Sequence, residues 1–379
     1  MAEETQDLKH LPLDGLHTEL GGKMVPFAGY LMPVQYGLGV KGEHLHVREK
    51  AGLFDVSHMG QAEVSVPSGS HEDAAALMEE LVPGEIAKLG RGRIRYTLLM
   101  GEDGGVLDDL MVTRLPDRDG TLFLVVNAAV KDQDFRVMEE HFGERADLKI
   151  LDRCLLALQG PTAHEVMAAL DPAAAEMPFM SMRETQLDGI PVRLSRCGYT
   201  GEDGYEISVS NADAEKLARR LLAHEDVEPI GLGARDSLRL EAGLCLYGHD
   251  MDPSDSPVSA GLTFAIGKRR REEGGFRGAE RVIRELHEGT DSLRVGLKPL
   301  GRAPAREGTE VRSPDGAVIG TVTSGGFGPT FEGPVAMGRV KTAFAEPGTT
   351  VHLMIRGKAQ AAEVVQLPFV EQRYYRAKK

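Results

Sequence analysis

The hydrophobic and polar positions of this chain follow two different patterns. Between residues 42 and 244, segments with apolar residues every three or four positions are interleaved with short apolar or alternating runs. The first pattern predicts amphipathic helices, at 42–51, 73–81, 130–142, 213–223 and 232–244. The second predicts strands, at 95–100, 106–112, 122–126, 154–158, 192–196 and 205–209. Such a mixture is typical of α+β folds with antiparallel sheets flanked by helices, and Gly52 is expected to end the first helix.

After Leu293 the pattern changes to short runs about ten residues apart, separated by glycine and proline turns. The runs are RVGLKP, TEVRS, VIGTVTS, VAMGRV, TVHLMI and AAEVVQL. This spacing with little helix predicts a small all-β barrel or sandwich. The sequence therefore predicts a multi-lobed chain. Residues 1–265 form an α+β region of two interleaved lobes, residues 266–290 a linker, and residues 291–379 a C-terminal β-barrel.

Composition and charge narrow the class of protein. A chain of 379 residues, 41% hydrophobic and 27% charged, fits a globular protein of two or three domains. Its net charge of −14 argues against a nucleic-acid partner, and no apolar run is long enough to span a membrane. The basic cluster at 268–271 precedes two glutamates and is interpreted as a solvated linker, with a docking patch for an acidic partner as the alternative.

The cysteines and the first residues bear on location. Three scattered cysteines, Cys154, Cys197 and Cys245, make neither a metal spacing nor a disulfide framework. The start, MAEETQDLKHLPL, lacks the pattern of a secretory signal or an organelle transit peptide. A cytoplasmic protein is therefore expected.

The most informative segment is GEDGGVLDDLMVTR at 101–114. A glycine turn enters an aliphatic strand that carries two adjacent carboxylates. Because side chains on a strand alternate between faces, Asp108 and Asp109 point in opposite directions and one of them lies among apolar groups. An ionised, unpaired carboxylate there is costly, so we expect it either to pair with another group or to serve a function. A buried ion pair or turn cap and a catalytic or ligand-binding role both remain open.

Two further segments carry candidate binding groups. In RCGYTGEDGYEIS at 196–208, Glu206 can accept two parallel N–H bonds from a guanidine-like edge such as a pterin, or it can be a strand-edge charge facing water. In the helix at 232–244, Arg235 and Arg239 lie one turn apart. They can clamp a carboxylate together, or pair at the surface with Asp236 and Glu241.

Several other chemistries are disfavoured. His44 and His46 cannot share a helix face, so a metal site with His58 is not expected. Asp55, Ser57 and His58 are too close in sequence for a catalytic triad, which is assembled across a fold. They are expected to shape a turn that lines a pocket, with Met59 packing on whatever occupies it. The glycine-rich segments GRGRIRY and SGGFGPT match no dinucleotide or phosphate-loop motif.

Taken together, the segments resemble one family over nearly the entire chain. They are LHTELGGKMVPFAGYLMPVQY, GLFDVSHMG, GGVLDDLMV, LALQGPTA, RCGYTGEDGYEIS, ARDSLRLEAGLCLYGHD, IGTVTSGGFGPT, VAMGRV and LPFVEQRYY. In this order they resemble the T-protein family, the aminomethyltransferases of the glycine cleavage system. The resemblance implies that tetrahydrofolate binds at the centre of three lobes. It implies that the aminomethyl group arrives on the lipoyl arm of the H-protein, that ammonia is released, and that 5,10-methylenetetrahydrofolate is formed.

The resemblance also implies roles for individual residues. Asp109 falls at the essential carboxylate beside the pterin, where it either stabilises a developing cation or acts as a base. Glu206 falls at the carboxylate that holds the guanidine-like edge of the pterin, and Arg235 and Tyr374 fall at folate contacts. The pocket lining is expected to include Met59, Tyr96, Asn127 and Tyr247. No metal is implied.

One departure and two alternatives accompany the resemblance. Gly101 stands where family members often have an asparagine before the double-glycine turn. A folate-dependent demethylase of a small methylated donor would share the fold but need no lipoylated partner. A non-catalytic folate-binding protein of iron–sulfur assembly would carry a KGCYxGQE-like signature, whereas here Cys197 is displaced and no glutamine follows.

Overall fold

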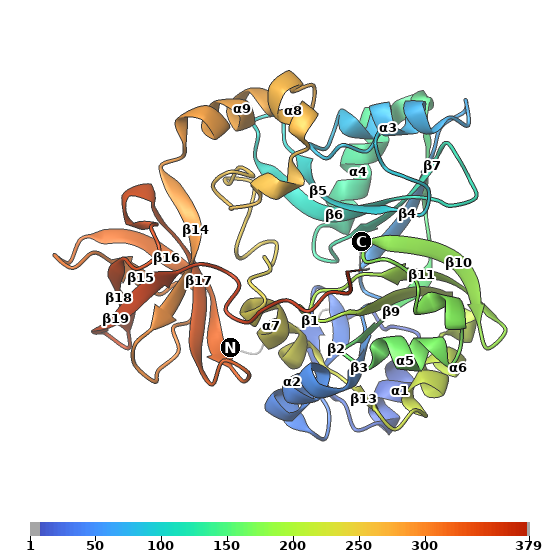
Figure 1. Ribbon diagram of the computed structural model, residues 1–379, viewed down its shortest axis with the longest axis horizontal. Helices are drawn as coiled ribbons and strands as arrows, with labels where there is room; N and C mark the ends of the chain where they lie inside the picture. The colour runs from blue at the N-terminus through green and yellow to red at the C-terminus, as the bar shows by residue number, and fades with distance from the viewer. Residues whose placement is uncertain (1–7, 377–379) are drawn as a thin grey trace.

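The computed structural model describes residues 8–376 and arranges them in three lobes around a common centre (Figure 1). Two α+β lobes come from the first 230 or so residues, and a β-barrel comes from residues 292–365. The predicted fold class is confirmed. Within residues 8–376, no helix has the length and apolar character needed to cross a bilayer.

The first lobe is built on a six-stranded sheet with the order β10-β11-β12-β9-β3-β13. Its strands are β3 (Ala51–Asp55), β9 (Arg153–Gln159), β10 (Ser181–Leu187), β11 (Ile190–Arg196), β12 (Gly204–Ser210) and β13 (Val227–Pro229). The helices α1 (Asp14–Glu19), α5 (Ala163–Ala168) and α6 (Asn211–Leu222) cover this sheet, and a core that includes Leu156, Ile207 and Leu217 lies between them. Neighbouring strands are antiparallel except β3 and β13.

The second lobe is built on a five-stranded sheet with the order β5-β6-β7-β4-β8. Its strands are β4 (Gly60–Ser65), β5 (Ile94–Met100), β6 (Val106–Arg114), β7 (Thr121–Val126) and β8 (Asp147–Ile150). Helices α3 (His71–Glu79) and α4 (Lys131–Phe142) pack on one face, where Leu110, Leu124 and Met138 are buried. The chain leaves the first sheet after β3 and returns to it at β9, so the two lobes are interleaved in sequence.

The third lobe is a closed barrel with the order β14-β17-β16-β15-β18-β19. Its strands are β14 (Ser292–Pro299), β15 (Glu310–Arg312), β16 (Val318–Gly328), β17 (Gly333–Lys341), β18 (Thr350–Ile355) and β19 (Lys358–Val365). The spacing of about ten residues thus predicted a barrel correctly. After β19 the chain runs back across the molecule to the first lobe (Figure 1), where the Arg373 amide donates to the Gly201 carbonyl at 2.7 Å.

The remaining elements connect the lobes. They are the hairpin β1 (Lys23–Phe27) and β2 (Tyr30–Gln35), and the helices α2 (Gly39–Glu49), α7 (Leu232–Glu241), α8 (Lys268–Glu273) and α9 (Ala279–Glu288). Short 3-10 turns lie at Gly143–Arg145, Pro172–Ala174, Thr263–Ala265 and Thr342–Phe344. Helix α7 packs against α2, β2 and the barrel strand β16, so it lies where two lobes meet.

Two sequence-based expectations are wrong. Gly52 does not end a helix, because α2 ends at Glu49 and Gly52 lies inside β3. A Cβ atom at Gly52 would lie 2.4 Å from Cγ1 of Ile230, so close packing requires the glycine. The basic cluster is not a solvated linker either: it forms α8, and Arg270 is buried with Nη1 3.5 Å from a carboxylate oxygen of Glu79.

Candidate functional site

The two adjacent aspartates lie on opposite faces of β6, as the alternation predicts. Asp108 is fully buried on the face that carries Leu110 and Val112. Asp109 keeps part of its surface accessible on the other face, opposite Leu98 of β5. The covered face therefore holds one carboxylate and the open face holds the other.

Asn127 joins the two carboxylates. It follows the last residue of β7, and its side-chain Nδ2 donates to Oδ1 of Asp108 at 2.8 Å and to Oδ1 of Asp109 at 2.7 Å. Its backbone amide donates to the other oxygen of Asp108 at 3.0 Å. Within residues 8–376, neither aspartate forms an ion pair with a lysine or arginine. The segment therefore forms no buried ion pair, whereas Asp108 does cap the turn after β7 by accepting the Asn127 amide. The binding or catalytic role of Asp109 stays a prediction.

The environment of Asp109 raises its pKa to about 7. The largest cause is loss of hydration, and the negative charge of Asp108 adds to it. Hydrogen bonds from Tyr96 and Asn127 act in the opposite direction, because they stabilise the ionised form. Asp109 is thus a carboxyl group that exchanges its proton near neutral pH, as expected of a group that meets a cation or a proton during a reaction.

Glu206 of β12 and Arg235 of α7 are two charged groups with incomplete hydrogen bonding. Among residues 8–376, the carboxylate of Glu206 accepts a hydrogen bond only from the thiol of Cys197, at 3.5 Å. Burial raises the pKa of Glu206, and the charge of Arg235 offsets part of the rise. Nη1 of Arg235 is buried and has no hydrogen-bond acceptor among the described residues. Its guanidinium instead lies over the ring of Tyr199, 4.8 Å from the centroid. Such groups fit a ligand that brings its own donors and acceptors.

Tyr199 links the two halves of the site, and sequence reasoning missed it. Its hydroxyl donates to the carbonyl of Cys245, and burial raises its pKa. The negative charge of Asp109 raises the pKa of Tyr199 and the positive charge of Arg235 lowers it, so all three side chains lie in one region. The signal available in the sequence was its position in the same segment as Glu206.

Three other predicted aromatic residues lie around this region. The ring of Tyr374, in the C-terminal segment, stacks on Phe179 at 4.3 Å with an interplanar angle of 17°. Tyr96 of β5 stacks on the exposed Phe264 at 5.7 Å. The Tyr247 hydroxyl donates to the carbonyl of Val106 at 3.4 Å, at the start of the strand that carries Asp109.

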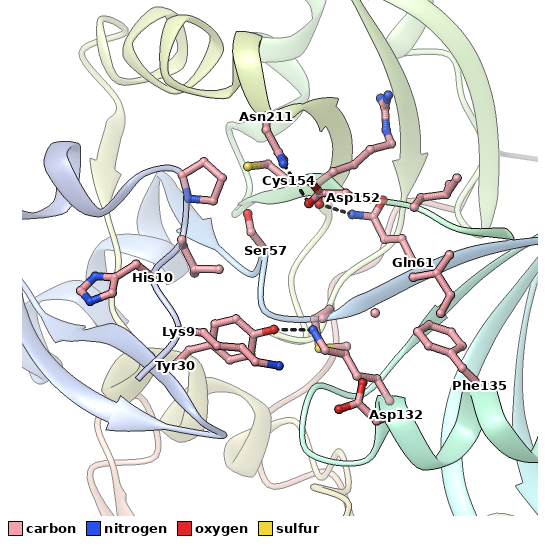
Figure 2. A pocket seen from close by; sticks show the side chains of 18 residues that line it. Lys9, His10, Tyr30, Ser57, Gln61, Asp132, Phe135, Asp152, Cys154 and Asn211 are labelled. Carbon is pink, nitrogen blue, oxygen red and sulfur yellow. Dashed lines mark hydrogen bonds between the residues drawn. The ribbon is translucent and has the colours of Figure 1, made fainter. Parts of the chain in front are cut away.

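Met59 borders a different space. A cavity of about 390 Å³ lies between the N-terminal segment and the start of α4, and its lining includes Met59 and Ser57 but none of the residues Asp109, Glu206 and Arg235 (Figure 2). At its edge Nζ of Lys131 donates to the hydroxyl of Tyr30 at 2.7 Å. Met59 and Met111 pack on the same hydrophobic core, and the side chain of Met111 shares the open face of β6 with Asp109.

The second arginine of α7 does not join the site. Arg239 is buried and pairs with Asp250 at 2.6 Å and, as the alternative interpretation predicted, with the exposed Asp236 at 2.8 Å, so a two-arginine clamp does not form. Glu241 is not at the surface as expected, because His44 at 3.0 Å and Arg48 at 3.1 Å hold it in the interior. Arg235 is therefore the arginine of this helix that remains available to a ligand.

Metal and triad chemistry find no support in the geometry. Over the described part of the chain, no three histidine, cysteine or acidic side chains converge as metal ligands. His46 bonds backbone carbonyls instead. The carboxylate of Asp55 bonds His17 at 2.9 Å and the backbone amide of Ser57 at 2.8 Å, and the Ser57 hydroxyl bonds the Leu155 backbone. These are structural contacts at a turn.

The turn before the aspartates is closed despite the unusual Gly101. The Gly101 amide donates to the carbonyl of Gly105 at 2.8 Å, and Asp103 accepts from the Gly105 amide at 3.1 Å. A Cβ at Gly105 would lie 1.9 Å from the Pro253 carbonyl oxygen, so the second glycine of the pair is needed for close approach of that loop. The departure at Gly101 thus leaves the entry into β6 intact.

Two family models match this chain, one over the two α+β lobes and one over the barrel. Residues 13–270 match the family model of the GCVT N-terminal domain, and residues 293–371 match that of the glycine cleavage T-protein C-terminal barrel domain. The mitochondrial aminomethyltransferase of Gallus gallus is 44% identical over 100% of this chain and 96% of its own length. That of Dictyostelium discoideum is 42% identical over 98% of this chain and 94% of its own.

A solved structure agrees with the three-lobed arrangement. The crystal structure of the glycine cleavage system aminomethyltransferase T from Bartonella henselae has a TM-score of 0.92 and 46% identity, and covers 97% of this chain and 100% of its own. One expectation is contradicted: the Gallus and Dictyostelium relatives are named mitochondrial, whereas the first residues were interpreted as those of a cytoplasmic protein. That interpretation rested on the absence of a leader pattern, which is weak ground for a location.

Proposed function

This chain belongs to the glycine cleavage T-protein family and is an aminomethyltransferase, and from that premise we propose its acceptor, its donor and its site residues. The acceptor is tetrahydrofolate, bound between Asp109 and the pair formed by Glu206 and Arg235. The donor is the aminomethyl group on the lipoyl arm of the H-protein. The products are ammonia and 5,10-methylenetetrahydrofolate.

The residues around Asp109 fit tetrahydrofolate. The observation that carries the proposal is the incomplete hydrogen bonding of Glu206 and Arg235. Tyr199 lies near both Arg235 and Asp109, so these groups and the open side of β6 belong to one region. The pterin edge offers parallel N–H donors to a carboxylate such as Glu206. Arg235 in turn meets an acceptor or an anionic group of the same molecule, and Tyr374 supplies aromatic surface from the C-terminal segment.

Each residue then has a definite task in the transfer. When bound, tetrahydrofolate supplies the nucleophilic nitrogen that takes up the one-carbon unit. Ionised Asp109 places a negative charge where the carbon of the aminomethyl group becomes positive as ammonia leaves. Because the pKa of Asp109 lies at about 7, the same carboxylate also takes up a proton at neutral pH at little cost.

The site also speeds the reaction by fixing the Asp109 carboxylate and by holding the two substrates together. The 2.7 Å bond from Asn127 fixes one oxygen of Asp109, and Tyr96 holds the carboxyl group from the neighbouring strand. A carboxylate fixed before the substrate arrives needs no reorganisation during the reaction. Holding donor and acceptor in contact makes the encounter effectively unimolecular.

The direct test is ammonia release by the purified chain supplied with aminomethylated H-protein. We expect release that depends on this partner and becomes faster when tetrahydrofolate is added. Methyl transfer from a small methylated donor without H-protein would instead support the demethylase alternative, which the relatives do not favour. Ammonia formed from free glycine alone would contradict the proposed reaction.

A further inference from the structure

Asp134 is a buried acid that the proposed reaction does not yet use. It lies in the first turn of α4, which packs on the covered face of the five-stranded sheet (Figure 1). Its side chain is fully buried, and both carboxyl oxygens lack an amide, hydroxyl or cationic donor among the described residues. An ionised carboxylate in such a place would be costly.

The neighbour of Asp134 is another buried acid, Asp108. A hydrogen bond between the two carboxyl groups is among the causes that shift the pKa of each, and Asp108 is also fully buried. Two carboxyl groups in contact inside a protein are not both ionised, so one of them holds a proton that both share. The other ionisable groups that act on Asp134 are Asp109 of β6 and the hydroxyl of Tyr247, and neither supplies a positive charge.

The hydrogen bonds decide which acid is neutral. Burial raises the pKa of Asp108 too, but Asp108 accepts two bonds from Asn127, at 2.8 Å and 3.0 Å, and these favour its ionised form. Asp134 accepts none, and burial followed by the charge of Asp108 raises the pKa of Asp134 to about 10. Asp134 is therefore the donor of this pair and Asp108 the acceptor.

We propose that Asp134 is a positioning residue of the aminomethyl transfer. As a neutral acid it donates to Asp108, and so keeps Asp108 as the charged acceptor that fixes Asn127 against Asp109. The expected effect of Asp134 on turnover rests on the proposed function. The chain of hydrogen bonds from Asp134 to Asp109 does not depend on it. It links a residue of α4, on the covered side of the sheet, to the reacting carboxylate on the open side.

Two substitutions separate this role from a merely structural one. Asp134→Asn keeps the shape and a neutral N–H donor, so kcat/KM and its acid limb should stay near those of the wild type. Asp134→Ala removes the donor, so we expect Asp108 to be protonated and no longer to repel the charge on Asp109. The pKa of Asp109 should fall, and the acid limb of the pH profile should move to lower pH with it. Because Asn127 is then no longer held by a charged Asp108, kcat/KM should fall roughly tenfold or more. A stability loss in Asp134→Ala with an unmoved acid limb would overturn the coupling.

A measurement on the wild-type protein keeps the proposal testable if the alanine variant does not fold. In protein labelled with ¹³C at the aspartate carboxyl carbon, the signal that disappears in Asp134→Asn belongs to Asp134. We expect this signal to remain that of a protonated acid from pH 5 to pH 8, and a signal that titrates near pH 4 would overturn the proposal. Because this readout needs no turnover, it decides the matter even if the chain releases no ammonia from aminomethylated H-protein.

Discussion

Nδ2 of Asn127 lies 2.7 Å from Oδ1 of Asp109 and 2.8 Å from Oδ1 of Asp108, so one amide group holds two carboxyl groups of neighbouring residues. Each of these carboxyl groups belongs to a different face of the sheet. The amide therefore connects a carboxylate on the covered side of the sheet to one on the open side.

Replacing Asp109 by asparagine tests the reacting carboxylate. Asp109→Asn is nearly isosteric but carries no charge, so we expect turnover to fall by about a thousandfold or more while tetrahydrofolate still binds. Ammonia release and calorimetric titration with the folate measure the two properties separately. The matched control is Asp117→Asn at an exposed position, which should leave both unchanged. Turnover that survives in Asp109→Asn would remove Asp109 from the mechanism.

The same substitution should change the pH dependence of stability. The folded pKa of about 7 lies above that of an unfolded aspartate, roughly 3.9, so between these values the native state binds more protons. The contribution of Asp109 to the free energy of unfolding is thus complete below pH 4 and declines as the pH rises to 7. Asp109→Asn lacks this decline, so its advantage over the wild type should grow by roughly 4 kcal/mol between pH 4 and pH 8.

Denaturant titrations at several pH values measure this difference. In Asp117→Asn, the difference from the wild type should stay flat over the same range. An advantage of Asp109→Asn that is equally flat would mean that Asp109 is ionised as easily in the folded chain as in the unfolded one. The raised pKa would then be wrong, whatever the effect on turnover.

The acceptor contact is tested at Glu206. Glu206→Gln keeps the size of the side chain but loses the charge, and we expect tetrahydrofolate to bind about ten- to a hundredfold more weakly, since a guanidine-like edge loses its ionic acceptor. Titration calorimetry measures the affinity, and Glu346→Gln, at an exposed position of the barrel lobe, is the control. Wild-type affinity in Glu206→Gln would place the pterin elsewhere.

The sequence predicts the strands and helices near the site, but it does not predict which distant residues pair with the buried charged side chains. The strand at 106–112 and the opposite faces of Asp108 and Asp109 follow from a period of two, which is a local property. The role of Asn127 and the burial of Asp134 depend on which strand and helix lie next to β6, and no local pattern contains that information. For the same reason Arg239 was not separable from Arg235: both occupy one helix face, and the partners that hold Arg239 away from the site include Asp250 and Ser324, which no local pattern identifies.

The role of Gly52 could not be predicted from local sequence either, because it depends on packing against distant residues. This packing leads to a further prediction. A Cβ added at Gly52 would lie 2.4 Å from Cγ1 of Ile230 and 2.6 Å from Cγ2 of Val47. Both neighbours are buried side chains that cannot move aside freely, so Gly52→Ala should lower the free energy of unfolding by about 2 kcal/mol. The matched control is Gly15→Ala in α1, where a Cβ meets no atom within 4 Å. Alanine also favours a helix, so the control should be neutral or slightly stabilising. Equal stability of the two variants in denaturant titrations would show that β3 is less tightly packed on Ile230 than this distance requires.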